Sequence, residues 1–167
     1  GYYGDLAARA RRAAPECAVA LDAEGEAFAR GVRQAPFFVK PNLHELSLYA
    51  GRPLSSRADI LAAAQSLLDA GVGAVLVSMG PDGALYVDRS HRLSAQAVPV
   101  EVRTTVGAGD AMVAGFLSAT AEGETPRGAF ARAVACAAAS VAGDIAGYAG
   151  CLQKVMLRPL EESPDSL

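Results

Sequence analysis

The sequence predicts an α/β fold in which a mostly parallel sheet carries helices on both faces. Short apolar runs of strand length, at residues 17–21, 37–40 and 74–78, alternate with segments that carry helical signals. This alternation is typical of βαβ units. Ser56-Arg57-Ala58-Asp59 resembles a capping box at a helix start, and Gly71 follows that helix as a stop signal. Hydrophobic residues make up 51% of the chain and charged residues 20%, as expected for a globular protein with a substantial core.

The elements are predicted from local signals along the chain. Pro15 ends the first helix, Pro41 stops the second strand, and Pro126 occupies the first position of the last long helix. Helices are predicted over residues 5–14, 24–34, 42–50, 59–70, 111–121 and 126–141. Strands are predicted over residues 17–21, 37–40, 74–78, 84–88, 92–97 and 98–103, of which the fourth and fifth form a hairpin. No regular element is predicted after Gly143.

The chain of 167 residues is long enough for one domain with its own core and too short for two ordinary domains. We expect residues 1–160 to belong to a single domain and residues 161–167 to form a frayed tail. Gly1-Tyr2-Tyr3 is typical of the interior of a longer protein. The domain is therefore expected to be truncated at its N-terminus.

The composition argues against several classes of partner. The net charge of −3 and the lack of a basic run argue against nucleic acid. A signal sequence and an apolar run of about 18 residues are both lacking, so neither secretion nor a membrane partner is expected. Three cysteines, Cys17, Cys136 and Cys151, are too few and too scattered for a disulfide framework or a zinc site. A reducing cytoplasm is the expected location.

The stretch from residue 104 to residue 116 combines a predicted strand end, a turn of small residues and a helix start. The preceding segment, residues 98–103, alternates and contains β-branched side chains, which favours a strand. Gly107 and Gly109 allow positive φ angles and leave the backbone amides uncovered. A glycine turn that opens a helix directs several unpaired N–H groups and the positive end of the helix dipole at one spot. The stretch therefore predicts an anion site.

Asp110 lies at the mouth of this predicted anion site. A carboxylate there repels a resting phosphate, so its chemistry must be something other than phosphate binding. Accepting the proton of a hydroxyl group that attacks a phosphoryl group fits this position. The alternative is that Asp110 only caps the helix and that Gly-Ala-Gly is only a tight turn.

Thr-Val-Gly-Ala-Gly-Asp followed by Met-Val-Ala-Gly-Phe resembles the signature of the ribokinase-like (PfkB-type) sugar kinases. The resemblance implies a ribokinase-like, Rossmann-like layered fold. It also implies that Asp110 is the catalytic base and that the amides of Gly107, Ala108 and Gly109 form the anion hole. Thr105 is then expected beside the bound nucleotide. Many relatives carry Asp or Asn where this chain has Thr104, so we assign no monovalent cation.

The segment from Lys40 to Glu45 follows a predicted strand and begins a helix. Asn42 can cap that helix, and Glu45 lies one turn further on the same face, so capping alone explains both residues. The segment is also similar to the family's Asn-x-x-Glu motif, which organises magnesium, often through water. The resemblance implies that Asn42 and Glu45 hold Mg²⁺ through water and that Lys40 contacts the nucleotide. His44 is expected to face solvent.

The loop from Ser78 to Gly83 follows a third apolar strand. Its composition is that of any tight turn, but it also resembles the family segment that lines the phosphates and ribose of ATP. By this resemblance Ser78, Gly80 and Gly83 contact the nucleotide. Ligands of a parallel sheet bind at the carboxyl ends of its strands. Asp22, Lys40, Ser78 and the Gly-Ala-Gly turn are all predicted to lie at those ends.

Within the family, the signature and the segments at residues 21–27 and 39–42 are most similar to the 1-phosphofructokinase branch. Tagatose-6-phosphate kinases are the near neighbours. The resemblance extends from residue 1 to about residue 142 and corresponds to the C-terminal half of a complete enzyme. The half that should hold the sugar is not part of it.

The resemblance implies an ATP-dependent and Mg²⁺-dependent transfer to the hydroxyl of a sugar phosphate, such as fructose 1-phosphate to fructose 1,6-bisphosphate. The partners are then ATP and a small sugar phosphate, and a homodimer of the complete protein is left open. The fragment alone is expected to be inactive. The alternative from another class is a nucleotide-binding or inactive remnant without turnover of its own.

Overall fold

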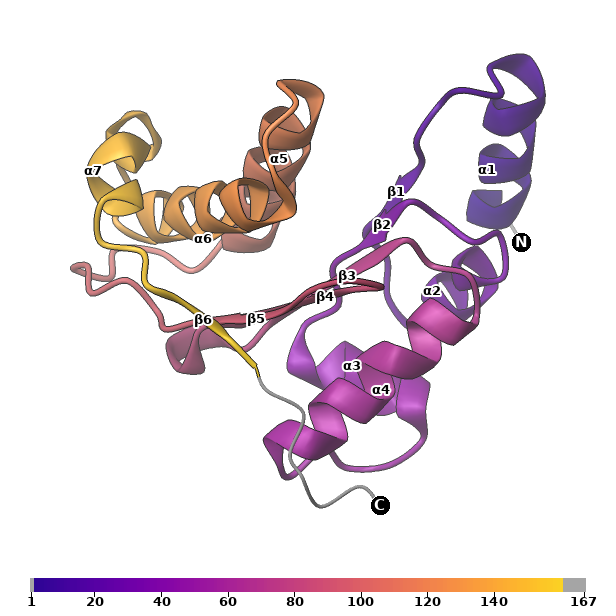
Figure 1. Cartoon of the computed structure of the whole chain (residues 1–167), viewed down its shortest axis with the longest axis horizontal. Helices are drawn as coiled ribbons and strands as arrows, with labels where there is room; N and C mark the ends of the chain where they lie inside the picture. The colour runs from indigo at the N-terminus through magenta and orange to yellow at the C-terminus, as the bar shows by residue number, and fades with distance from the viewer. Residues whose placement is uncertain (1, 161–167) are drawn as a thin grey trace. The chain divides into compact units, whose positions relative to one another are not determined.

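The computed structural model describes residues 2–160, without the side chains of residues 2–4. Its strands form one sheet in chain order (Figure 1). Neighbours β1 and β2 and neighbours β2 and β3 pair in parallel, whereas β5 and β6 pair antiparallel. The predicted α/β class is confirmed. The strands described are β1 (Ala20–Leu21), β2 (Phe38–Val39), β3 (Ala74–Ser78), β4 (Ala84–Asp88), β5 (Arg92–Ala95) and β6 (Leu157–Pro159). The tail predicted at residues 161–167 lies outside the described residues.

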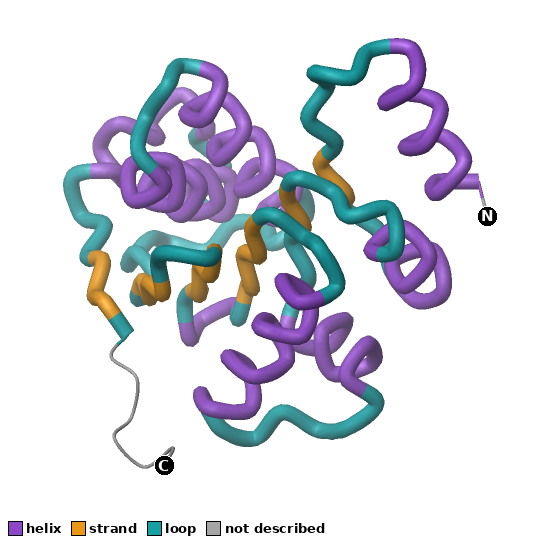
Figure 2. Tube along the Cα trace, turned by 45° about the vertical axis from the view of Figure 1, so that its right-hand side comes forward, coloured by secondary structure: helices purple, strands orange, loops and turns teal. Residues whose placement is uncertain are grey.

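Helices account for more of the chain than strands do, as the purple and orange segments of Figure 2 show. The helices in the described part are α1 (Tyr2–Ala13), α2 (Gly25–Val32), α3 (Leu43–Ala50), α4 (Arg57–Asp69), α5 (Ala108–Ala121), α6 (Pro126–Val141) and α7 (Tyr148–Leu152). Two 3₁₀ turns, η1 (Gly80–Asp82) and η2 (Ile145–Gly147), complete the list. None of the helices within residues 2–160 is long and apolar enough to cross a membrane.

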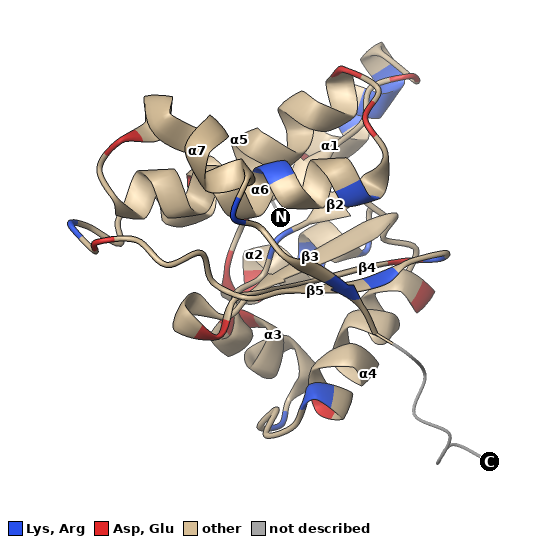
Figure 3. Ribbon diagram, turned by 60° about the vertical axis from the view of Figure 1, so that its left-hand side comes forward, with Lys and Arg blue, Asp and Glu red and all other residues tan. Residues whose placement is uncertain are grey.

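The chain divides into two compact units. Unit 1 runs to Ser78 and includes Val87–Ser90, and unit 2 comprises Met79–Tyr86 and the chain from His91 onward. That residues 1–160 belong to a single domain stays a prediction. In Figure 3 basic (blue) and acidic (red) residues are interspersed along helices and loops, in keeping with the net charge of −3.

Unit 1 is built from helices whose ends carry the predicted signals. Ser56 begins α4, its hydroxyl accepts the N–H of Asp59, and the Asp59 carboxylate accepts the N–H of Ser56 at 3.0 Å. The predicted capping box is therefore confirmed. The hydrogen bond from the Ser56 hydroxyl and the Arg52 guanidinium lower the pKa of Asp59 to about 2. Gly51 ends α3 in the left-handed conformation with φ +67°. The largest fully buried side chains of unit 1 are Phe38, Leu46, Leu67, Leu76, Val32, Val39, Val72, Val75, Val77 and Val87.

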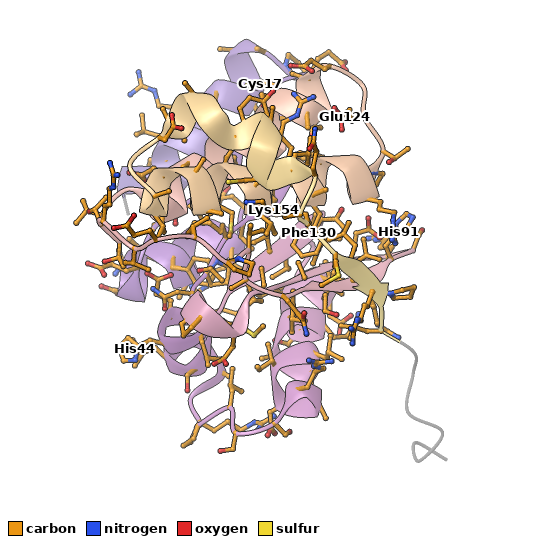
Figure 4. All side chains as sticks on the ribbon, turned by 90° about the vertical axis from the view of Figure 1, so that its left-hand side faces the viewer. Cys17, His44, His91, Glu124, Phe130 and Lys154 are labelled. Atoms are coloured by element: carbon orange, nitrogen blue, oxygen red, sulfur yellow. The ribbon has the colours of Figure 1, made fainter. Side chains whose placement is uncertain are left out.

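Unit 2 is organised by the close packing of α5 against α6 (Figure 1). Gly115 makes this approach tight: an added Cβ would lie 2.9 Å from the Arg132 carbonyl oxygen and 2.9 Å from Cys136 Sγ. Thr125 caps α6 and Pro126 occupies its first turn, as predicted. Three aromatic rings pack together in the core of this unit. The Tyr86 ring lies 5.6 Å from that of Phe116 and 5.7 Å from that of Phe130, which is fully buried (Figure 4).

The strand predicted over residues 98–103 is wrong, because this segment is a loop. Its alternation does not correspond to one buried face, since Val98 is buried whereas Val102, in the same phase of the alternation, is 67% exposed. Pro99 has no N–H to donate to a sheet. The N–H groups of Arg103 and Thr104 donate to the Val141 carbonyl at the end of α6, at 2.9 and 3.2 Å. The loop is thus held by a helix end and not by a strand.

The absence of regular structure predicted after Gly143 is also wrong. The chain there forms η2, α7 and the edge strand β6, in which Arg158 pairs with Ser94 of β5. The Arg127 guanidinium also donates to the Leu157 carbonyl at 3.1 Å. A strand of three residues at a sheet edge has no hydrophobic alternation to reveal it. Its formation depends on a distant partner strand.

Replacement of Gly115 by Ala is expected to reduce the free energy of unfolding by about 1–3 kcal/mol, because the new methyl group would overlap α6. Gly150→Ala in α7 is the matched control, since an added Cβ there meets nothing within 4 Å. The control should be neutral or slightly stabilising, because Ala favours a helix over Gly. Urea unfolding of both variants measures the difference. Equal stability of the two variants would show that the α5–α6 contact relaxes without cost.

Candidate active site

The turn that opens α5 is defined by the conformation of Gly107 and by a hydrogen bond in the loop before it. Gly107 has φ +81° and is the N-cap of α5, as its predicted freedom for positive φ requires. The Thr104 hydroxyl accepts the N–H of Val106 at 3.1 Å, which closes the loop just before the turn. Gly109 lies inside the first turn of α5, and its φ is not among the positive ones. Left-handed geometry is therefore used at Gly107 and not at Gly109.

The start of α5 has no side-chain cap. The three helices α3, α4 and α6 begin with capping side chains, those of Asn42, Ser56 and Thr125. At α5 the N–H groups of Gly109 and Asp110 have no hydrogen-bond partner among the described residues. Because the helix dipole places positive charge at the same point, these amides can bind an anion.

Asp110 is the third residue of α5, and its side chain is exposed. A carboxylate at this position can accept the N–H of the N-cap residue, but Asp110 makes no such hydrogen bond within the part of the chain that the structure describes. The alternative that Asp110 serves only as a cap therefore lacks its hydrogen bond. The carboxylate remains open to accept a proton beside an anion site.

Asn42 and Glu45 form the reciprocal pair that the capping interpretation requires. The Asn42 side-chain oxygen accepts the N–H of Glu45 at 2.9 Å, and Glu45 Oε2 accepts the N–H of Asn42 at 2.8 Å. Ser78, the last residue of β3, forms a parallel bridge with Asn42 and donates its N–H to the Pro41 carbonyl at 3.1 Å. Asn42, Glu45 and Ser78 are therefore brought together at the end of β3. A water-mediated role of Asn42 and Glu45 toward Mg²⁺ stays a prediction.

Lys40 lies immediately beyond the end of β2. Its side chain is buried, with 6% exposed, and its Nζ lies 3.6 Å from Oδ1 of Asp22, which follows β1. In unit 1 the carboxyl ends of β1, β2 and β3 thus carry Asp22, Lys40 and Ser78, as predicted from the strand order. Sequence reasoning placed Asp22 there but gave it no role.

The two glycines of the Ser78–Gly83 loop differ in what requires them. A Cβ on Gly83 would lie 2.0 Å from the Ala95 carbonyl oxygen, so the chain's own backbone excludes a side chain there. Gly80 has φ +59° and open space around the position of a Cβ. A ligand could therefore approach the backbone at Gly80. At Gly83 the contact with the backbone of Ala95 is enough to explain why a glycine is needed. Contact of either glycine, or of the exposed Thr105, with a nucleotide stays a prediction.

The remaining metal-ligating residue types do not gather. Within residues 2–160 no group of three or more His, Cys, Asp or Glu side chains could hold a metal ion. His44 is exposed on α3, as predicted (Figure 4). Cys17 is exposed, Cys136 is half-buried and Cys151 is buried, and burial raises the pKa of the Cys136 thiol. Mg²⁺ here would need water and substrate phosphates as further ligands, which is its usual preference.

Residues 2–148 match the family model described as pfkB family carbohydrate kinase. The chain belongs to this family. Among its relatives, the 1-phosphofructokinase of Haemophilus influenzae is 38% identical over 150 residues, which cover 86% of this chain and 48% of the relative. The 1-phosphofructokinase of Escherichia coli (strain K12) is 41% identical over 99 residues, which cover 59% of this chain and 32% of the relative. The chain thus spans half or less of the length of these curated relatives.

Solved structures of PfkB-type kinases have the same fold. Phosphofructokinase-2 from Escherichia coli in complex with fructose-6-phosphate superposes with a TM-score of 0.82 at 28% identity, covering 90% of this chain and 50% of that one. Ribokinase from Arabidopsis thaliana complexed with ribose and ATP superposes with a TM-score of 0.77 at 24% identity, covering 91% and 52%. The second likeness concerns the fold alone. The predicted ribokinase-like fold is confirmed.

Glu45 and Asp110 occupy the same third position of α3 and α5, so their removal tests whether either acts as a cap. Glu45→Ala is expected to reduce the free energy of unfolding by about 0.5–2 kcal/mol, because it breaks the reciprocal pair with Asn42. Asp110→Ala should change it by less than about 0.5 kcal/mol, because the lost dipole interaction offsets the gain in helix propensity. Thermal and urea unfolding measure both changes. An equal loss in the two variants would show that Asp110 is a cap.

Proposed function

We propose that the chain is the nucleotide-binding half of a sugar kinase that transfers the γ-phosphoryl group of ATP to a hydroxyl of a sugar phosphate. The observation that carries this proposal is the uncapped start of α5, where unpaired amides lie beside the exposed carboxylate of Asp110. Relatives named 1-phosphofructokinase at 38–45% identity support fructose 1-phosphate as the acceptor and fructose 1,6-bisphosphate as the product. Tagatose 6-phosphate is the second candidate acceptor, because the sugar-binding half lies outside the chain.

Each residue of the α5 turn has a distinct role in this proposal. Asp110 accepts the proton of the acceptor hydroxyl as its oxygen attacks the γ-phosphorus. The amides of Gly107, Ala108 and Gly109 donate to the phosphoryl oxygens, on which negative charge is spread in the transition state. Gly107 already holds the left-handed conformation that shapes the turn, and the N–H of Ala108 would exchange its long 3.5 Å contact with the Thr105 carbonyl for a phosphoryl oxygen.

The other predicted site residues are proposed to hold the nucleotide phosphates and the metal ion. Lys40, Ser78, Gly80, Gly83 and Thr105 are the proposed nucleotide contacts. Glu45 offers a half-buried carboxylate, and Asn42 fixes it by a hydrogen bond, which suits a water-mediated ligand of Mg²⁺. Bound Mg²⁺ would supply neutralisation of the phosphate charge. Phosphofructokinase-2 from Escherichia coli, 30% identical to this chain, was solved in complex with substrates and products, which supports a substrate site in this fold.

The chain by itself is proposed to bind Mg–ATP weakly and to phosphorylate no sugar. Holding the acceptor hydroxyl in line with the phosphorus can supply on the order of 7–11 kcal/mol of barrier reduction, which this half cannot provide alone. A remnant that binds nucleotide without turnover is the second candidate function.

Assembly and location remain predictions. Phosphofructokinase-2 from Escherichia coli has a tetrameric inhibited form and was also solved with potassium. The tetramer supports self-association of the complete protein, for which the sequence left a homodimer open. Thr104 uses its hydroxyl to accept a backbone N–H in this chain, and we assign it no cation. The cytoplasm remains the predicted location.

Asp110→Asn in the complete enzyme is expected to lower kcat by about 10²–10⁴-fold and to leave the KM for ATP nearly unchanged. The reason is that a general base acts on the chemical step and not on nucleotide binding. Steady-state kinetics with ATP and fructose 1-phosphate measure both constants. Glu101→Gln is the matched control, because Glu101 is an exposed acid in the loop before the turn. Near-normal kcat in Asp110→Asn would remove this residue from the mechanism.

Glu45→Gln in the complete enzyme is expected to raise the Mg²⁺ concentration needed for half-maximal rate. Gln keeps an oxygen that can accept the N–H of Asn42 but lacks the charge that attracts a hydrated cation. Asp59→Asn makes the same change in the capping box of α4 and should leave the Mg²⁺ dependence unaltered. Titration of the rate with Mg²⁺ at saturating substrates compares the two variants. The same Mg²⁺ dependence in both would restrict Glu45 to its capping role.

A further inference from the structure

Lys40 and Asp22 face each other through the register of two parallel strands. Leu21 of β1 pairs with Val39 of β2, so the next residues along the two strands are Asp22 and Lys40. Their charged groups lie 3.6 Å apart, and the Lys40 side chain is 6% exposed whereas that of Asp22 is 36% exposed. The cation of this pair is therefore buried, and its counter-ion is half in solvent.

The Lys40 ammonium group has N–H donors that are not used in hydrogen bonds within the described part of the chain. A distance of 3.6 Å exceeds that of a hydrogen bond, and Lys40 makes no side-chain hydrogen bond to any of residues 2–160. An ammonium group has three N–H donors, and burial of a cation is costly unless these are used. No fully enclosed side-chain nitrogen or oxygen in the described part of the chain lacks a hydrogen-bond partner. The Lys40 nitrogen is therefore not fully enclosed by the described residues, and its N–H groups are left for another acceptor.

We propose that Asp22 is a displaceable counter-ion that restricts Lys40 to anions carrying at least two charges, such as a phosphoryl group. The identity of this anion as a nucleotide phosphate rests on the proposed function, whereas the selectivity does not. Asp22 acts through Lys40 and is thus a residue that determines specificity.

The charges of the competing groups account for the selectivity. A singly charged anion such as acetate would replace the Asp22 carboxylate by a group of equal charge that is not held by the chain. A phosphoryl group brings more negative charge and three acceptor oxygens, which match the three donors of the ammonium group. Because Asp22 is partly exposed, its carboxylate can return to water when it is displaced.

The test is the thermal unfolding of the 167-residue chain in metal-free buffer at constant ionic strength, with increasing pyrophosphate or acetate. Pyrophosphate should raise the Tm of the wild-type chain and acetate should not. In Asp22→Asn the pyrophosphate concentration needed for a half-maximal Tm shift should fall by on the order of tenfold. Acetate should then also raise the Tm. Glu24→Gln removes an exposed charge two residues further on and should behave as wild type.

The Lys40→Met background isolates the pair from any other anion site in the chain. There, Asp22→Asn should have no effect on the response to either anion. If Asp22→Asn does not fold, Asp22→Ser should show the same gain, and Asp22→Glu should keep the wild-type selectivity.

The inference is overturned if removal of the Asp22 charge weakens the pyrophosphate response, or if acetate remains without effect. It is equally overturned if the gain persists in Lys40→Met. Failure of the proposed function would appear separately, as a complete enzyme that shows this anion selectivity but does not phosphorylate a sugar.

Discussion

The close packing of α5 against α6 at Gly115 is the constraint on which the geometry of unit 2 depends. A side chain at this position would collide with the backbone of α6 at Arg132. The same helix α6 ends at Val141, whose carbonyl accepts the N–H groups of Arg103 and Thr104. One helix therefore fixes both the body of α5 and the loop that leads into it. The turn at Gly107 is therefore held in place by α6, and no capping side chain covers its amides.

Helix starts in this chain differ in whether a side chain caps them, and α5 is one of those without such a cap. In unit 1 the reciprocal pairs Asn42–Glu45 and Ser56–Asp59 satisfy the first amides of α3 and α4. In unit 2 the start of α5 is left uncapped, with Asp110 exposed beside it. Unpaired amides cost stability unless water or a ligand satisfies them. At α5 the exposed carboxylate of Asp110 lies beside these amides, so a ligand as well as water could satisfy them.

Local signals predicted the elements that depend on few partners. The capping box at Ser56, the cap at Thr125 and the strand β3 all have their cause within a few residues of sequence. Prediction from the sequence was wrong where the conformation of a segment depends on a partner far away in the chain. Residues 98–103 alternate like a strand, yet the carbonyl of Val141 takes the N–H groups at the end of this segment. The edge strand β6 exists because β5 pairs with it, and nothing in Leu157–Pro159 indicates this.

The candidate site shows the same division. The signature predicted the anion turn and Asp110, because a glycine N-cap and a helix start are local features. The opposition of Asp22 and Lys40 requires the register of two parallel strands, which periodicity alone does not provide. The roles in phosphoryl transfer follow neither from local sequence signals nor from the strand register, and they come from the resemblance to the PfkB family. The family match over residues 2–148 confirms the family itself.

The central claim is that the uncapped amides at the start of α5 receive the phosphate groups of a nucleotide. Amide chemical shifts of the ¹⁵N-labelled 167-residue chain, recorded during titration with Mg–ATP, test it most directly. The account predicts that the largest saturable shifts belong to the amides from Gly107 to Asp110, with weak affinity. Unchanged signals from these amides, at nucleotide concentrations that shift others to saturation, would contradict it.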